Sequence, residues 1–353
     1  MQTYIHPSPI TLESGITLPG YHLGYTVLGK MNQEKSNVVW IFHALTANSD
    51  PSEWWPGLVG TGKLFDPDKF CIVCVNMPGS CYGSIGPLDI NSESGNPFYH
   101  SFPFFTTRDM IRCYQPLKNY LGIERIHIGI GGSMGGQQLL EWAVEEPALF
   151  DYIFPIATNA QHSPWGIAFN ASQRFAIESD QTWLQKDPAA GMEGMKVARS
   201  IALISYRHYE TYHRSQSETD EVRLTGYRSE SYQRYQGEKL AKRFNAFSYH
   251  ALSKGMDAHH VGRNRGGITS SLNKVRAKTM AIGIKTDILF PVSEQQTLAE
   301  LIPGAAFSMI QSDYGHDGFL LESEQIAAHI KEFTRQDKSH FIQSEIISQY
   351  GSA

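Results

Sequence analysis

The sequence has few cysteines, no long apolar run and no excess of positive charge. Its 353 residues include four cysteines, too few to hold a chain of this length together by disulfides. No apolar segment approaches the roughly 18 residues of a transmembrane helix, and the first residues lack the basic and apolar regions of a signal peptide. With 30 basic and 35 acidic residues, the net charge is −5. We therefore expect a cytoplasmic protein that binds neither nucleic acid nor a membrane.

Sequence motifs for nucleotide cofactors and metals are also missing. The chain contains neither G-x-G-x-x-G nor G-x-x-x-x-G-K-[ST]. Cys71 and Cys74 lie in an apolar run typical of a strand, where residues three apart face opposite sides and cannot share a metal. Asp257, His259 and His260 are close in sequence, but no second cluster with ligand spacing accompanies them. We expect no metal and no resident cofactor.

Short apolar runs bounded by turn residues recur along the chain. They are continuous rather than alternating, which favours strands of a parallel sheet that is covered on both faces. Helical patterns over residues 107–121 and 134–146 lie between some of them. The alternation predicts an α/β fold with a mostly parallel sheet and helices on both faces. The predicted strands are residues 38–42, 70–75, 126–130, 152–156, 280–284 and 306–310.

The region from 161 to 275 has a different composition. It is polar, rich in Tyr, Arg, Gln and Ser, and interrupted by glycines, with a helical pattern over 195–206 and no convincing buried strand. We interpret it as a helical insertion, a lid, between two strands of the core. The predicted core is residues 1–160 and 276–335, and residues 336–353 form a polar C-terminal tail.

The strongest chemical signal is Gly131-Gly132-Ser133-Met134-Gly135, a G-x-S-x-G between a predicted strand and a predicted helix. A serine on such a tight turn has strained backbone angles and needs small residues two positions before and after it. Ser133 would then stand at the carboxyl edge of the sheet, where open α/β sheets bind ligands. We predict that Ser133 is a nucleophile; the alternative is a glycine-rich turn capped by serine.

A serine nucleophile needs a base and a group that orients the base. Asp287 and His316 each follow a predicted strand, and the chain order Ser, Asp, His is that of α/β-hydrolases. His316 would accept the Ser133 proton and Asp287 would orient the imidazole. Taken singly, Asp287 could cap a helix and His316 could be any one of 14 histidines. The joint arrangement favours a catalytic triad.

Two backbone N–H groups are the predicted donors to the oxyanion. Met134 begins the helix after the nucleophile, and Leu45 lies in the loop after an early strand. His43, at the start of the same loop, is more simply explained as a structural hydrogen-bonding residue.

Longer motifs resemble the homoserine O-acetyltransferase family, over residues of about 10 to 330. Three carry most of the resemblance: His43-Ala44-Leu45-Thr46, Gly131-Gly132-Ser133-Met134-Gly135-Gly136-Gln137 with Leu140-Glu141-Trp142, and Gly315-His316-Asp317. Further matches include Cys81-Tyr82-Gly83-Ser84, Tyr235-Gln236-Gly237-Glu238-Lys239, Arg243-Phe244 and Met256-Asp257-Ala258-His259.

The resemblance implies an α/β-hydrolase core with a helical lid, through which the protein would form a homodimer. It also implies that Ser133 takes an acetyl group from acetyl-CoA, the co-substrate, and passes it to the side-chain hydroxyl of L-homoserine for methionine synthesis. In the family an Arg and a Tyr seven residues later bind the amino acid, and Arg199 and Tyr206 match them. Asp317 matches the partner of the substrate ammonium. The alternative interpretation is that Arg199 is a surface charge, Tyr206 a packing residue and Asp317 the N-cap of the following helix.

Three segments depart from the usual family pattern. Ala47-Asn48 stands in place of Gly-Ser, Pro78-Gly79-Ser80 in place of a Gly-Gly pattern, and Leu88-Asp89 where two serines are common. Several alternatives therefore stay open. The donor could be succinyl-CoA, the acceptor serine, or the protein an esterase or a non-catalytic binding protein of the same fold.

Overall fold

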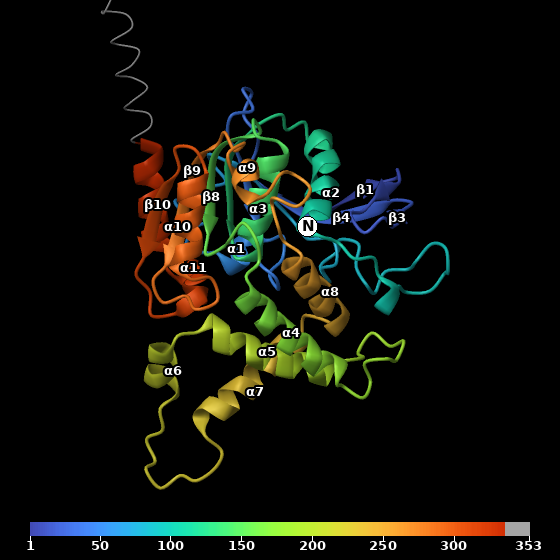
Figure 1. The fold of residues 1–353 in the computed structure, drawn as a ribbon, viewed down its shortest axis with the longest axis vertical. Helices are drawn as coiled ribbons and strands as arrows, with labels where there is room; N and C mark the ends of the chain where they lie inside the picture. The colour runs from blue at the N-terminus through green and yellow to red at the C-terminus, as the bar shows by residue number, and fades with distance from the viewer. Residues whose placement is uncertain (336–353) are drawn as a thin grey trace, which may run out of the picture.

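The computed structural model describes residues 1–335, so the predicted tail at 336–353 lies outside the described residues. Its centre is an eight-stranded sheet in the order β1-β4-β6-β5-β7-β8-β9-β10, with β1 and β10 at opposite edges (Figure 1). The pairs β1–β4 and β4–β6 are antiparallel, and every neighbouring pair from β6 to β10 is parallel. The strands of this sheet are β1 (Gln2–His6), β4 (Tyr21–Leu28), β5 (Val38–Phe42), β6 (Cys71–Val75), β7 (Ile126–Gly132), β8 (Phe150–Ile156), β9 (Lys278–Ile284) and β10 (Ala306–Ile310). A separate two-stranded sheet consists of β2 (Ile10–Thr11) and β3 (Thr17–Leu18).

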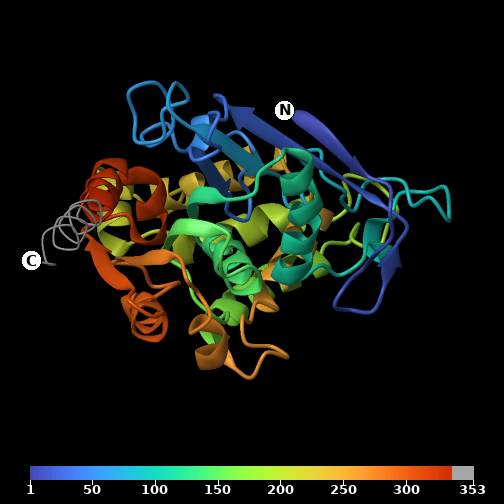
Figure 2. The same ribbon diagram turned by 90° about the horizontal axis from the view of Figure 1, so that it is seen from above.

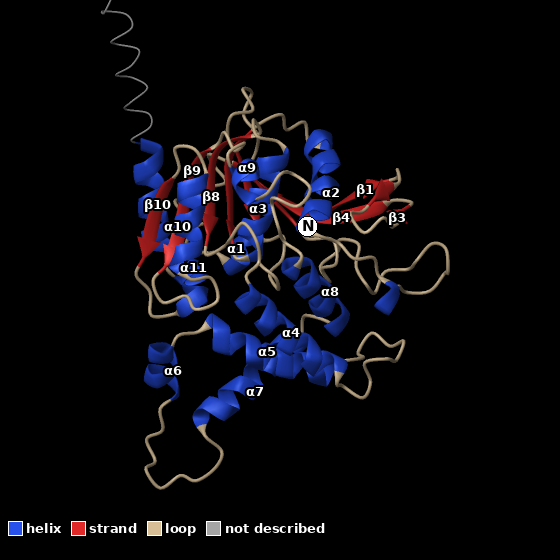
Figure 3. Ribbon diagram, viewed as in Figure 1, coloured by secondary structure: helices blue, strands red, loops and turns tan. Residues whose placement is uncertain are grey.

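The helices alternate with the strands of the core, as the sequence predicts (Figure 3). They are α1 (Pro51–Trp54), α2 (Thr107–Tyr120), α3 (Met134–Glu145), α4 (Pro164–Glu178), α5 (Met192–Tyr206), α6 (Tyr209–Gln216), α7 (Arg228–Ala241), α8 (Ala246–Asp257), α9 (Ile268–Leu272), α10 (Val292–Leu301) and α11 (Gly318–Leu321). Two 3-10 helices, η1 (Tyr99–Ser101) and η2 (Gly315–Asp317), and a last helix over residues 323–335 complete the set. The mostly parallel sheet with helices on both faces is therefore confirmed.

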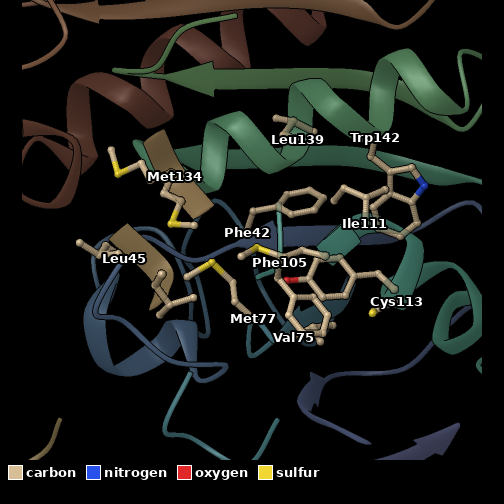
Figure 4. Packing of buried hydrophobic residues seen from close by; sticks show 14 of the residues in the cluster. Phe42, Leu45, Val75, Met77, Phe105, Ile111, Cys113, Met134, Leu139 and Trp142 are labelled. Atoms are coloured by element: carbon tan, nitrogen blue, oxygen red, sulfur yellow. The ribbon is translucent and has the colours of Figure 1, made fainter. Parts of the chain in front are cut away.

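The continuous apolar runs are explained by burial on both faces of the sheet. Alternate residues of β5 point to opposite sides: Trp40 and Phe42 pack with α2 and α3, whereas Val39 and Ile41 pack with the cluster on the other face. Figure 4 shows the first cluster from close by, where Phe42 and Trp142 have ring centroids 6.0 Å apart. Because neither face meets water, the run needs no alternating polar residues.

Between β8 and β9 the chain forms a group of helices, α4 to α8, beyond the carboxyl ends of the strands (Figure 1). These helices bury apolar side chains of their own, among them Ile177, Met195, Ala198 and Leu240. We call this group the lid helices. The domain limits at residues 160 and 276 remain a prediction.

Two strands at one edge of the sheet, β1 and β4, were not predicted from the sequence. In β4, Gly24 interrupts the apolar run, and a Cβ at this position would lie 2.9 Å from the Gly83 carbonyl oxygen. In β1 no residue is buried: three are exposed and two are partly exposed. Both strands therefore lack the buried apolar run by which the parallel strands were found. Figure 2 shows this N-terminal edge on the far side of the molecule from the last described helix.

Candidate active site

Ser133 stands on a sharp turn between β7 and α3. Its backbone φ is 56° and ψ is −127°, a left-handed conformation that non-glycine residues rarely adopt. A Cβ at Gly131 would lie 2.5 Å from the carbonyl carbon of Gly135, and a Cβ at Gly135 would lie 2.1 Å from the carbonyl oxygen of Phe42. The turn therefore requires glycine at both positions, for the steric reason expected from the motif.

Asp287 and His316 are in direct contact. His316 Nδ1 donates to Asp287 Oδ2 at 2.7 Å, and the side chains are 3% and 0% exposed. The other carboxylate oxygen of Asp287 accepts from the backbone N–H groups of Leu289 (2.8 Å) and Phe290 (2.9 Å). Because the carboxylate holds the proton on Nδ1, Nε2 of the neutral ring is left as a proton acceptor.

Ser133 and His316 line the same cavity. Within residues 1–335 no hydrogen bond joins the Ser133 hydroxyl to the imidazole, a bond that in unliganded enzymes often tightens only when substrate binds. The ring of His316 is held among aromatic side chains. It stacks on Phe290 with centroids 5.1 Å apart, and the rings of Tyr206 and Phe319 lie at 5.7 Å and 5.3 Å.

The two predicted oxyanion donors have free N–H groups. Within residues 1–335, the backbone N–H groups of Leu45 and Met134 donate to no other group. Leu45 lines the cavity, and Met134 directly follows Ser133. Unpaired N–H groups beside a buried serine suit the stabilisation of a negatively charged tetrahedral intermediate.

His43 supports the Leu45 loop, in agreement with its interpretation as a structural residue. Its ring is fully buried, Nδ1 donates to the Ala44 carbonyl at 2.9 Å, and Nε2 accepts from the Met77 N–H at 3.1 Å. Burial lowers the pKa of His43 to about 4, so the ring stays neutral at physiological pH.

The cavity above Ser133 has a volume of about 410 Å³ and lies between the core and the lid helices. Its charged lining residues are Glu53, Arg199, Lys239, Arg243 and Asp317. The remaining lining residues are Ala44, Leu45, Thr46, Ala47, Asn48, Trp54, Tyr82, Ser133, Tyr206, His316, Phe319 and Leu320. Core and lid thus both contribute to one site.

The three predicted substrate residues all line this cavity. Arg199 and Tyr206 lie two turns apart on one face of α5, and the Arg199 Cζ is 5.6 Å from the centre of the Tyr206 ring. Burial raises the pKa of Tyr206, so the phenol remains a neutral hydrogen-bond donor. Within residues 1–335 no hydrogen bond or ion pair to a carboxylate uses the Arg199 guanidinium, which leaves it open to an anionic ligand.

Asp317 is paired with a residue that the sequence analysis did not single out. Arg207 Nε lies 2.9 Å from Asp317 Oδ2, although the N–H does not point at the oxygen, so the contact is an ion pair without a hydrogen bond. Burial raises the pKa of Asp317, and Arg207 and Arg199 act in the opposite direction. Arg207 immediately follows α5 and is the residue after Tyr206. This position beside a predicted substrate residue is the signal by which the sequence could have indicated Arg207.

Other residues reach the site from loops; the sequence motifs include them, but none was predicted to be a site residue. Arg243 donates to the Thr46 carbonyl and to the Tyr82 hydroxyl, both at 2.6 Å. Asn48, at one of the positions that depart from the family pattern, lines the cavity and donates to Glu53 at 3.0 Å. Pairings between such distant loops leave no periodic pattern in the sequence.

The residues discounted as metal ligands have other roles. Cys71 and Cys74 belong to the clusters on opposite faces of the sheet, as expected for positions three apart in a strand. Asp257 pairs with Arg174 at 2.5 Å. His259 lies 3.0 Å from both the Thr107 hydroxyl and the Asn159 carbonyl oxygen. Residues 1–335 contain no group of three or more potential ligands placed to hold a metal ion.

Comparison with known proteins places the chain in a family. The alpha/beta hydrolase fold family matches residues 37–323. A homoserine O-acetyltransferase from Cyclobacterium marinum is 48% identical over 324 residues, which cover 92% of each chain. The crystal structure of homoserine O-acetyltransferase from Bacillus anthracis superposes with a TM-score of 0.87 at 24% identity, covering 94% of this chain and 96% of that one.

An esterase of known structure, E22, has nearly the same fold. It superposes with a TM-score of 0.84 at 21% identity, covering 94% of this chain and 98% of that one. The fold is therefore shared by hydrolases and acyltransferases, and the sequence relatives are what separate them. Because the Cyclobacterium marinum relative is 48% identical over 92% of each chain, this chain is an enzyme that belongs to the homoserine O-acetyltransferase family of the α/β-hydrolase fold.

Proposed function

We propose that this protein transfers an acetyl group from acetyl-CoA to the side-chain hydroxyl of L-homoserine, through an acetyl group carried on Ser133. The observation that supports it best is the Arg199 guanidinium, which lines the same cavity as Ser133 and His316 and has no carboxylate partner within residues 1–335. A guanidinium there suits the carboxylate of an amino-acid acceptor. An esterase, in which water accepts the acyl group, would not need it. The product, O-acetylhomoserine, would serve methionine synthesis.

In the first half-reaction the Ser133 oxygen attacks the thioester carbonyl while His316 Nε2 takes the hydroxyl proton. The N–H groups of Leu45 and Met134 stabilise the oxyanion, and Asp287 stabilises the imidazolium. The C–S bond then breaks, and the proton on Nε2 passes to the departing thiolate, so that CoA leaves as the thiol. The enzyme is left with an ester on Ser133 and a neutral histidine.

In the second half-reaction homoserine enters the cavity that CoA has left. Its carboxylate would pair with Arg199, with Tyr206 donating a hydrogen bond, and its ammonium would lie near Asp317. His316 removes the proton from the side-chain hydroxyl, whose oxygen attacks the acetyl-serine carbonyl. The Ser133 oxygen leaves and takes the proton back from His316, which restores the enzyme.

The direct test is thiol release from acetyl-CoA, with and without homoserine. Release that depends on homoserine and disappears in Ser133→Ala supports the transferase. Release at the same rate without homoserine would identify an esterase, and no acetyl adduct on Ser133 by intact-mass spectrometry would reject the mechanism. A parallel comparison of acetyl-CoA with succinyl-CoA, and of homoserine with serine, assigns the donor and the acceptor.

We also propose that the enzyme is a cytoplasmic homodimer that meets its copy through the lid helices and needs no resident cofactor. Within residues 1–335 no helix is long and apolar enough to span a membrane. Several large apolar side chains are exposed on α4 and α5, namely Trp165, Phe175, Val197 and Ile204. Sedimentation of the wild type as a dimer, and of Phe175→Glu with Ile204→Glu as a monomer, supports this assembly. A monomeric wild type would reject it.

A further inference from the structure

Arg243 connects the lid helices to the loop that carries an oxyanion donor. It directly follows Lys242, the C-terminal cap of α7, and its Nη1 donates to the Thr46 carbonyl and the Tyr82 hydroxyl, both at 2.6 Å. Thr46 is the residue after Leu45. A side chain from the lid region therefore holds the Thr46–Ala47 peptide, two peptide groups after the one that carries a predicted catalytic N–H group.

Both ends of the Leu45 loop are fixed to the core. At its start, the buried ring of His43 accepts from the Met77 N–H at 3.1 Å. At its end, Ser49 accepts from the Asn76 amide at 3.0 Å, and Asn76 is fully buried just after β6. These bonds position residues 43 and 49 whether or not the lid is in place.

In the middle of the loop, the Thr46 carbonyl depends on Arg243. One turn hydrogen bond, from the Ala47 N–H to the Ala44 carbonyl (3.0 Å), lies across it. Within residues 1–335 the Thr46 carbonyl accepts from Arg243 alone, and the Leu45 N–H has no partner. The Ala44–Leu45 peptide, which carries that N–H, is held through its carbonyl by His43 and Ala47, and the Leu45 side chain is buried in the core. Without Arg243, the Thr46 carbonyl would lose its hydrogen bond, and the backbone just after Leu45 would be held less firmly.

The guanidinium is itself held in place. The Tyr82 ring packs edge-on against Phe244 with centroids 5.7 Å apart, and the Cys81 thiol donates to the Arg243 carbonyl at 3.6 Å. Within residues 1–335 Arg243 forms no ion pair with a carboxylate, so its charge is directed to the two oxygens it contacts. One planar group with several N–H donors can serve two acceptors at once, which a lysine ammonium does less well.

We propose that Arg243 is a positioning residue: by holding the Thr46 carbonyl it fixes the backbone after Leu45 and, together with the bonds to the Ala44 carbonyl, keeps the Leu45 N–H pointed at the developing oxyanion. The inference rests on the acyl-serine mechanism proposed above, but not on the identity of the donor or acceptor. Oxyanion donors act through accurate placement, so a loosened loop should slow acylation without weakening substrate binding. The lid would thereby contribute to the chemical step as well as to the binding of substrate.

The experiment measures acylation of Ser133 by p-nitrophenyl acetate, which reports the first half-reaction without CoA or homoserine. We expect Arg243→Gln to lower the acylation rate constant about 10- to 100-fold, which does not exceed the loss caused by removing an oxyanion donor entirely. KM for p-nitrophenyl acetate should change less than about 2-fold. Arg243→Lys should recover part of the rate, and Tyr82→Phe should lower it by a smaller factor. Lys242→Gln removes the neighbouring exposed charge outside the cavity and serves as the matched control.

Thermal unfolding of each variant separates positioning from stability. An unchanged melting temperature with a slower rate supports the proposal. A wild-type rate in Arg243→Gln, or a higher KM at an unchanged rate, overturns it. If Arg243→Gln does not fold, Tyr82→Phe decides, because a wild-type rate in that variant would also overturn it. Failure of homoserine-dependent thiol release with normal p-nitrophenyl acetate acylation would reject the proposed substrates and leave this inference intact.

Discussion

His316 Nδ1 and Asp287 Oδ2 lie 2.7 Å apart, and the backbone after Asp287 binds the other oxygen of that carboxylate. The arrangement selects one imidazole tautomer and holds the ring while Phe290 stacks on it. In the proposed mechanism Asp287 would both orient the imidazole and supply negative charge opposite the imidazolium.

This contact predicts the effect of Asp287→Asn. The amide keeps the size of the side chain but can donate to Nδ1, which would move the ring proton to Nε2 and block proton transfer from Ser133. We expect kcat to fall by about 10⁴-fold with little change in melting temperature. Steady-state assays with circular dichroism as the folding control would check this, and a loss below about 10-fold would contradict the triad.

Arg199→Gln should affect the amino-acid acceptor selectively. Removing a charge-assisted hydrogen bond to a carboxylate costs about 1.5–3 kcal/mol, so we expect KM for homoserine to rise about 10- to 100-fold. KM for acetyl-CoA should stay near its wild-type value. Arg234→Gln, which removes a lid arginine paired with Glu230, is the matched control. Equal increases for both substrates would argue against the assignment of Arg199.

Gly135→Ala should disrupt the turn at the nucleophile. The added Cβ would meet the Phe42 carbonyl oxygen at 2.1 Å, and a backbone atom of a central strand cannot move away as a side chain can. We expect a loss of about 1–3 kcal/mol or more in the free energy of unfolding, together with loss of activity. In Gly283→Ala the nearest atom is a side-chain oxygen of Gln295 at 3.1 Å. Urea unfolding should show a smaller effect there.

Stability should decrease as the pH falls from about 6.5 to 4, because buried histidines resist protonation. Burial lowers the pKa of His43 to about 4, of His162 to about 4 and of His259 to about 3, from 6.5. Between these values the unfolded chain binds more protons than the folded one. The contribution of these histidines to the free energy of unfolding is therefore fully present above pH 6.5 and is lost as the pH falls. For His43 alone the difference corresponds to about 3 kcal/mol.

Urea unfolding at several pH values checks this linkage. His43→Gln should reduce the dependence of the free energy of unfolding on pH, because the amide cannot titrate. His213→Gln, at an exposed position, should keep the wild-type dependence. An identical pH dependence in wild type and His43→Gln would show that His43 does not contribute.

Much of the site could be located from the sequence because its geometry has local causes. Ser133 needs a left-handed backbone conformation, and that conformation requires small neighbours, so Gly131 and Gly135 signal it within five residues. The apolar runs before Asp287 and His316 identified the sheet edge at which both side chains meet. The continuous runs of β5 to β10 were found in the same way, whereas the antiparallel strands β1 and β4 were not.

The amino-acid sequence alone determined the α/β alternation and the turn at Ser133, since each follows from residues close together in the chain. The order of the predicted triad residues, Ser133, Asp287 and His316, can also be read from it directly. Only the tertiary structure decided that Arg207 pairs with Asp317 and that Arg243 binds the Thr46 carbonyl. Those contacts join residues brought together by how the lid helices pack on the core. A long flexible side chain such as arginine can reach partners in many directions, so its position in the sequence does not indicate which one it binds.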